Sequence, residues 1–77
     1  MIKIYSTPSC VYCRGLKEYL KSKGFDYNEV DVSVDQKELE EMVEISGQMG
    51  VPVIDIDGNV VIGFDKERVD EILEIKE

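Results

Sequence analysis

The chain has 77 residues, which is enough for one small domain and too few for two. It carries 17 acidic residues against 9 Lys and Arg, a net charge of −8, and no basic stripe that would bind nucleic acid or an anionic membrane. Its apolar runs are only a few residues long, far short of the roughly 20 that span a bilayer. We therefore expect a single domain over residues 1–77, in the cytoplasm, with neither nucleic acid nor membrane as a partner.

The first half of the chain predicts a strand, a helix and a second strand. Apolar and polar residues alternate over residues 2–6, which is typical of a strand. Residues 11–23 place apolar side chains at helical spacing and end in lysines before Gly24, as a helix with a glycine stop does. Residues 25–32 return to a period of two. This order implies a right-handed crossover between two parallel strands.

The second half predicts a helix, a hairpin and a last helix. Ser33 and Gln36 have the spacing of a capping box, so we expect the second helix to begin there and to end at Gly47. Residues 51–62 indicate two strands joined by an Asp-Gly turn. Asp65 can cap the last helix. Its apolar face would contain Val69, Ile72, Leu73 and the stem of Lys76.

The predicted element order is β-α-β-α-β-β-α, in the α/β class. The parallel first pair and the antiparallel hairpin give a mixed four-stranded sheet flanked by three helices, which can cover both of its faces. Asp55 and Asp57 alternate with isoleucines, so we expect them to point to solvent from an edge strand. Four acids of the second helix lie opposite its apolar face, and we interpret them as solvated: Glu38, Glu40, Glu41 and Glu44.

Cys10 and Cys13 are the only cysteines, and the chain has no histidine. They stand three residues apart at the start of the first helix, close enough to form a disulfide. The unpaired N–H groups and the positive dipole end of that helix favour the thiolate at Cys10, which makes it the candidate nucleophile. Cys13, one turn further on, would stay a thiol until it attacks a mixed disulfide and releases the bound partner.

Other interpretations of the CxxC stay open. A structural disulfide is disfavoured in a cytosolic chain and would close only a short loop. A metal or iron-sulfur site needs more ligands, which only a dimer sharing Cys10 and Cys13 of both subunits would supply. A peptide-binding adaptor without redox turnover is a third possibility. Arg14 and Lys17 follow the reactive turn and either support a thiolate, bind an acidic partner or are simply solvated, and we favour the last.

Three segments of the chain resemble the glutaredoxin family of the thioredoxin superfamily: TPSCVYC at residues 7–13, GVPVI at 50–54 and DGNVVIGFD at 57–65. The resemblance covers nearly the whole chain and implies a thioredoxin-like fold. It also implies a cis Val51-Pro52 bond, although only about 5–6% of X-Pro bonds in folded proteins are cis and the bare pattern favours trans. Carried over by position, it implies Cys10 and Cys13 as the catalytic pair and a substrate-binding set of Tyr12, Val51, Pro52, Gly63, Phe64 and Asp65.

The resemblance implies a thiol-disulfide oxidoreductase that reduces protein or glutathione mixed disulfides. We expect a monomer with no bound cofactor or metal and with glutathione as a candidate co-substrate. Two positions depart from the glutathione-using pattern: Thr7 stands where many glutaredoxins have Lys or Arg, and Gly63-Phe64 replaces a Gly-Gly pair. The second departure resembles the NrdH-type redoxins, which take electrons from thioredoxin reductase and donate them to ribonucleotide reductase. Glutathione and thioredoxin reductase are therefore alternative electron sources.

Overall fold

A four-stranded sheet in the order β2-β1-β3-β4 organises residues 1–75, the part of the chain that the computed structural model describes. The strands are β1 (Ile2–Ser6), β2 (Asn28–Asp31), β3 (Val53–Ile56) and β4 (Asn59–Ile62). β1 and β2 are parallel, whereas β3 is antiparallel to both β1 and β4. The predicted mixed sheet is confirmed, with a second strand shorter than the periodicity suggested.

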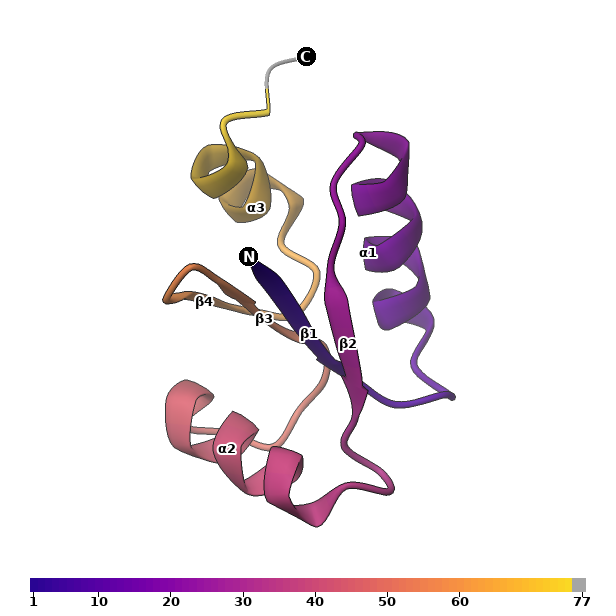
Figure 1. The fold of residues 1–77 in the computed structure, drawn as a ribbon, viewed down its shortest axis with the longest axis vertical. Coiled ribbons are helices and arrows are strands. Elements are labelled where there is room, and N and C mark those ends of the chain that lie inside the picture. The colour runs from indigo at the N-terminus through magenta and orange to yellow at the C-terminus, as the bar shows by residue number, and fades with distance from the viewer. Residues whose placement is uncertain (76–77) are drawn as a thin grey trace.

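Three helices cover both faces of the sheet (Figure 1). They are α1 (Val11–Ser22), α2 (Gln36–Ser46) and α3 (Lys66–Leu73), so the predicted element order is also confirmed. α1, which joins the parallel strands β1 and β2, lies on one face together with α3, and α2 lies on the other face. No helix within residues 1–75 has the length and apolar content needed to cross a membrane.

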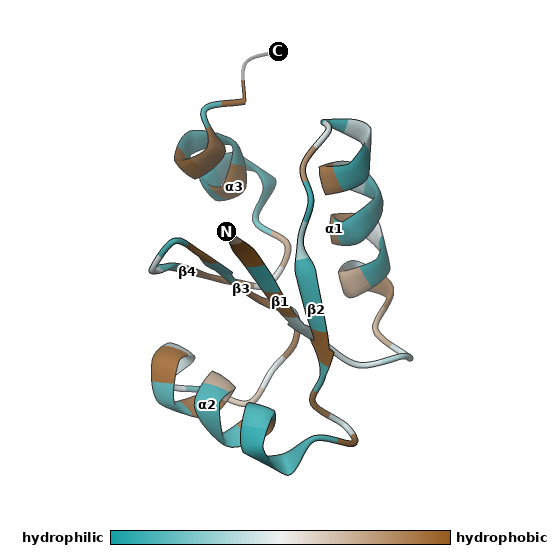
Figure 2. Ribbon diagram, in the orientation of Figure 1, coloured by the Kyte–Doolittle hydropathy of each residue, from teal (hydrophilic) through white to brown (hydrophobic). Residues whose placement is uncertain are grey.

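Two apolar clusters hold these layers together, and the alternation of side chains along β1 supplies both of them. In Figure 2 the brown, apolar parts of the α1 ribbon lie on its side next to β2. The cluster under α1 and α3 contains Ile2, Ile4, Leu16, Leu20, Ile54, Ile56, Val61 and Val69. The cluster under α2 contains Tyr5, Val32, Met42 and Val53. Ile72 and Leu73 pack against the first cluster as predicted, while Lys76 lies outside the described residues.

The start of α2 differs from the prediction. Asp35, not Ser33, is the N-cap, and its carboxylate accepts a hydrogen bond from the Glu38 N–H at 3.2 Å. Ser33 instead donates its N–H and its hydroxyl to the Asp31 carboxylate, at 2.9 and 2.5 Å. The capping box at Ser33 is therefore wrong, because α2 begins at Gln36 and the capping acceptor is the Asp35 carboxylate. The predicted end of the helix at Gly47 is confirmed, with a left-handed φ of 75°.

The acids of α2 are only partly solvated. Lys3 of β1 reaches over this face, with its Nζ 2.8 Å from Glu38 and 3.4 Å from Glu41. The buried Tyr5 donates its hydroxyl to Glu41 at 2.9 Å. That hydrogen bond, with the charge of Lys3, lowers the pKa of Glu41. The interpretation as a purely solvated face holds for the other two acids, which are exposed.

The hairpin acids also differ from expectation, because β3 is an internal strand paired on both sides. Asp55 is only half-exposed and accepts a hydrogen bond from the Gly58 N–H at 2.8 Å, which stabilises the turn. Asp57 is exposed and pairs with the amino terminus of Met1. The edge-strand interpretation is therefore wrong for Asp55, since β1 pairs with the side of β3 that the predicted hairpin leaves open.

Gly15, inside α1, and Gly47, at the end of α2, offer matched tests of side-chain packing and of backbone conformation. A Cβ at Gly15, inside α1, would lie 3.6 Å from the Phe64 ring, which is an ordinary van der Waals contact. We expect Gly15→Ala to raise the free energy of unfolding by about 0.5–1 kcal/mol, because alanine loses less backbone entropy in a helix. Gly47→Ala should lower it by about 1 kcal/mol, because φ is 75° there. Urea unfolding measures both values, and a destabilised Gly15→Ala would contradict the ordinary contact between a Cβ at this position and the Phe64 ring.

Candidate active site

The reactive loop connects the end of β1 to the start of α1, and Cys10 is the N-cap of that helix. Its backbone is extended, with φ −83° and ψ 113°, and its carbonyl accepts the Arg14 N–H at 3.3 Å. Its sulfur accepts a hydrogen bond from the Cys13 N–H at 3.1 Å. The sulfur therefore occupies the position at which Ser or Asp oxygens usually cap a helix, where backbone donors and the helix dipole favour an anion.

Cys10 and Cys13 are both free thiols, but their surroundings differ. Cys10 is partly exposed, whereas Cys13 is 1% exposed. Burial raises the pKa of the Cys13 thiol to about 12, and its hydrogen bond with Cys10 contributes to the increase. Cys13 is therefore protonated at neutral pH, and the thiol that a partner can reach is Cys10.

The cis-proline loop lies at the same end of the sheet as the reactive loop. The Val51-Pro52 peptide bond is cis, as the family resemblance implied. β3 starts directly afterwards at Val53, which pairs with Tyr5 near the end of β1. Pro52 is buried and accepts a hydrogen bond from the Gly63 N–H at 2.8 Å. The geometry thus brings the reactive loop, the cis-proline and Gly63 to one region.

The remaining predicted substrate residues have different surroundings. Tyr12 is 70% exposed at the start of α1. Phe64 is half-buried and packs against Tyr19, with the ring centroids 5.9 Å apart, so it also joins α3 to α1. Asp65 is exposed and caps α3 by accepting the Arg68 N–H at 3.2 Å. Phe64 and Asp65 therefore have structural contacts beside any contact with substrate.

Sequence reasoning missed Gln48, which precedes the cis-proline loop. Its side chain accepts the Gly50 N–H at 2.7 Å and donates to the Gly50 carbonyl at 3.0 Å. This pair of hydrogen bonds fixes the backbone two residues before Pro52. A single glutamine in a loop carries no sequence signal for such a role, because the contact depends on the backbone path.

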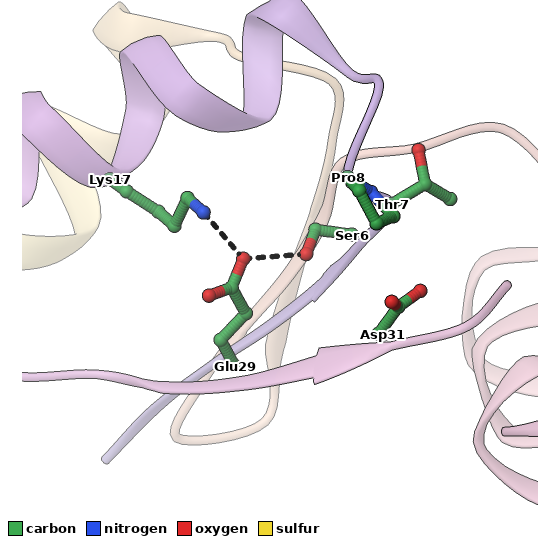
Figure 3. Close-up of a pocket in the computed structure, with 6 residues that line it drawn as sticks. All are labelled: Ser6, Thr7, Pro8, Lys17, Glu29 and Asp31. Carbon is green, nitrogen blue, oxygen red and sulfur yellow. Dashed lines mark hydrogen bonds and ion pairs between the residues drawn. The ribbon is translucent and has the colours of Figure 1, made fainter. Parts of the chain in front are cut away.

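A pocket of about 310 Å³ borders the reactive loop (Figure 3). It is lined by Ser6, Thr7, Pro8, Lys17, Glu29 and Asp31. Lys17 Nζ lies 2.8 Å from a carboxylate oxygen of Glu29, so Lys17 is not simply solvated as the sequence suggested. The signal available was the position of Lys17, four residues after Cys13 and hence on the same helix face. The Glu29 partner comes from another element, which no local pattern indicates.

Within residues 1–75, no group of three or more His, Cys, Asp or Glu side chains is arranged to hold a metal ion. The two cysteines alone supply two sulfur donors, whereas structural zinc and iron-sulfur sites normally use four ligands. The arrangement that one chain presents is a reduced dithiol at a helix start. Such a dithiol can exchange with disulfides through a mixed-disulfide intermediate.

The fold and the dithiol define a protein of the thioredoxin-like class with a redox-active CxxC. The profile of the glutaredoxin family matches residues 2–61. Over 74 residues the chain is 57% identical to an uncharacterised glutaredoxin-like 8.6 kDa protein from the rubredoxin operon of Clostridium pasteurianum, covering 96% of this chain and 99% of that one. The chain belongs to the glutaredoxin family, and it is an oxidoreductase of that family.

Solved structures show the same fold. A point mutant of the thioredoxin-like protein BC3987 superposes with a TM-score of 0.91 at 33% identity, covering 97% of this chain and 96% of that chain. The glutaredoxin-like NrdH-redoxin of Escherichia coli superposes with a TM-score of 0.76 at 26% identity, covering 99% and 95%. The thioredoxin-like fold that the sequence resemblance implied is thus confirmed.

The difference between the thiols predicts selective alkylation. At about pH 8 the native reduced protein should take up one iodoacetamide per chain, at Cys10, because Cys13 is buried and its pKa of about 12 keeps it protonated. Peptide mass spectrometry locates the label. Native Cys10→Ser should stay unlabelled and native Cys13→Ser should take one label, while denatured wild type should take two. Equal labelling of both thiols in the native protein would contradict the assignment of Cys13 as the protected thiol.

Proposed function

We propose that the chain reduces protein disulfides and mixed disulfides, with Cys10 as nucleophile and Cys13 as resolving thiol. The Cys10 thiolate attacks a substrate disulfide, which forms a mixed disulfide and releases one substrate thiolate. Cys13 then loses its proton and attacks the Cys10 sulfur, which releases the second substrate sulfur as a thiolate. The substrate gains two electrons, and the protein is left with a Cys10–Cys13 disulfide that an external reductant resets.

One observation carries this proposal: the partly exposed Cys10 sulfur is held by the Cys13 N–H at 3.1 Å, while Cys13 is buried. Nucleophilic and resolving roles need this asymmetry, because the first thiol must meet a partner and the second must wait. The two cysteines are also three residues apart at a helix start, which is close enough for them to form a disulfide. Exchange therefore needs no large backbone movement.

Substrates would bind along the cis-proline loop. The backbone of Val51, next to Pro52, would pair with an extended segment of the substrate as an added strand does. The support is the position of this loop at the end of the sheet where β1 enters the reactive loop. Tyr12 would border the segment on one side, and Gly63, Phe64 and Asp65 would border it near Pro52. Main-chain pairing suits varied disulfide-containing proteins, because backbone hydrogen bonds do not depend on which side chains the substrate carries.

Two electron sources follow from the family: glutathione, used as a co-substrate, and thioredoxin reductase. Asp65 already caps α3, and Glu67 adds an acidic residue to its first turn. A glutathione carboxylate approaching this helix start would meet charge of the same sign. This favours the second candidate, an NrdH-type redoxin that takes electrons from thioredoxin reductase and donates them to ribonucleotide reductase. In both cases the protein would act as a cytoplasmic monomer without a bound cofactor.

Parallel coupled assays test the function and separate the electron sources. Protein disulfide reduction is followed by NADPH oxidation, with glutathione plus glutathione reductase in one arm and thioredoxin reductase in the other. We expect turnover in at least one arm, faster with thioredoxin reductase, and none for Cys10→Ser. Cys13→Ser should accumulate the mixed disulfide and lose turnover with thioredoxin reductase.

Retained turnover in Cys10→Ser would overturn the proposal. So would an inactive wild type that purifies anaerobically as a dimer carrying metal or an iron-sulfur cluster, because that result supports the module that shares Cys10 and Cys13 between subunits. Metal analysis and the mass in solution show whether an inactive wild type is this metal-bound dimer. An inactive, metal-free monomer would also contradict the proposed redox turnover.

A further inference from the structure

The ion pair between Lys17 and Glu29 lies on the side of the resolving thiol. Lys17 follows Cys13 by four residues in α1, so the two side chains leave the same helix face one turn apart. Its Nζ is 2.8 Å from Glu29 Oε2 in β2. The hydroxyl of Ser6, a buried residue in β1, donates to the same oxygen at 2.7 Å. Figure 3 shows Lys17 and Ser6 converging on this carboxylate from two elements.

This trio forms part of the wall of the 310 Å³ pocket beside the reactive loop. Thr7 and Pro8 of that loop form another part of the wall, and neither cysteine lines it. The side chains of Lys17 and Glu29 are 30% and 34% exposed, so water reaches the ion pair. The pocket is therefore not the place where a substrate meets Cys10. One of its lining residues, Lys17, belongs to α1 and follows Cys13 by about one helical turn.

The surroundings of Cys13 shift its pKa in opposite directions. Burial and the neighbouring Cys10 raise the pKa of Cys13, whereas the Thr7 backbone and the positive charge of Lys17 lower it. Lys17 in turn faces Glu29 and Tyr27, and Glu29 also faces Asp31. Because Lys17 Nζ contacts the Glu29 carboxylate, the field that Lys17 exerts at the Cys13 sulfur is partly cancelled.

We propose that Lys17 and Glu29 are positioning residues that set the rate at which Cys13 resolves a mixed disulfide. Lys17 stabilises the negative charge that develops on the Cys13 sulfur, and Glu29, held by Ser6, fixes the lysine and weakens its effect. This inference rests on the proposed function. In the step, the Cys13 thiol gives its proton to a solvent base, its thiolate forms a bond to the Cys10 sulfur, and the bond from Cys10 to the substrate breaks, so the substrate sulfur leaves with the electron pair.

Substitutions of Lys17 and Glu29 should change the rate of resolution in opposite directions. Removing the cation in Lys17→Met should slow resolution by about two- to threefold at a fixed pH. A rise of half to one unit in the pKa of Cys13 lowers the thiolate fraction about three- to tenfold, and the higher nucleophilicity of the more basic thiolate offsets part of that loss. Removing the anion in Glu29→Gln should speed resolution by a similar factor, because the lysine is no longer neutralised. Lys17→Arg keeps the charge and should stay near the wild-type rate.

Stopped-flow exchange with dithiobis(nitrobenzoate), an aromatic disulfide, measures both steps because each releases a coloured thiolate. The first release reports attack by Cys10, and the second reports attack by Cys13 on the mixed disulfide. Profiles from about pH 5 upward resolve the second phase, since few Cys13 thiols are ionised there. Lys21→Met serves as the matched control, because Lys21 is an exposed lysine of the same helix.

We expect the second phase to shift in opposite directions in Lys17→Met and Glu29→Gln, with the first phase, Lys17→Arg and Lys21→Met unchanged. Equal second phases in all variants, or slowing in both Lys17→Met and Glu29→Gln, would overturn the inference. A merely structural role would slow both variants and lower their urea midpoints together. If Cys10 itself fails to react in wild type, the proposed function fails instead, so the two failures are distinguishable.

Discussion

The site depends on one hydrogen bond, from the Cys13 N–H to the Cys10 sulfur. It sets where α1 begins and therefore how both cysteines are oriented, since each residue of a helix turns the chain by about 100°. A helix starting one residue later would take the sulfur of Cys10 off the cap position and would turn Cys13 out of the core. Helix initiation and the arrangement of the dithiol are thus the same structural event.

Much of this arrangement can be predicted from sequence because it follows from local periodicity. The strand at residues 2–6 and the helix after Cys10 follow from spacing alone, and the strand-to-helix junction indicates where the dithiol lies. The cis state of Val51-Pro52 is different, because a proline at a strand start is compatible with both isomers. There the bare pattern favoured trans and the family resemblance implied cis, which is the isomer in the structure.

The predictions that the structure contradicts fail for one physical reason, which is that local spacing does not identify the partner that a side chain or strand finds in the fold. Ser33 has the spacing of a cap, yet its hydroxyl donates to Asp31 and the Asp35 carboxylate accepts the capping hydrogen bond. Asp55 alternates as an edge residue does, yet the strand order makes β3 internal. Lys17 appeared solvated because its partner is on β2, in an element that only the crossover brings alongside α1. Residue spacing cannot rank such partners.

Within the described residues, the cation that acts on Cys13 already has a counterion in the reduced dithiol. At Cys10 the nearest stabilising group is a backbone N–H, which carries no net charge and needs no counterion once the sulfur enters a neutral disulfide. At Cys13 the cation is Lys17, whose charge the contact with Glu29 partly cancels. A lysine without that partner would stabilise a thiolate more strongly, but it would stand uncompensated beside each disulfide form. In the proposed cycle, the permanent pairing of Lys17 with Glu29 therefore lets the protein pass between dithiol, mixed disulfide and disulfide with little change in the balance of charge around it.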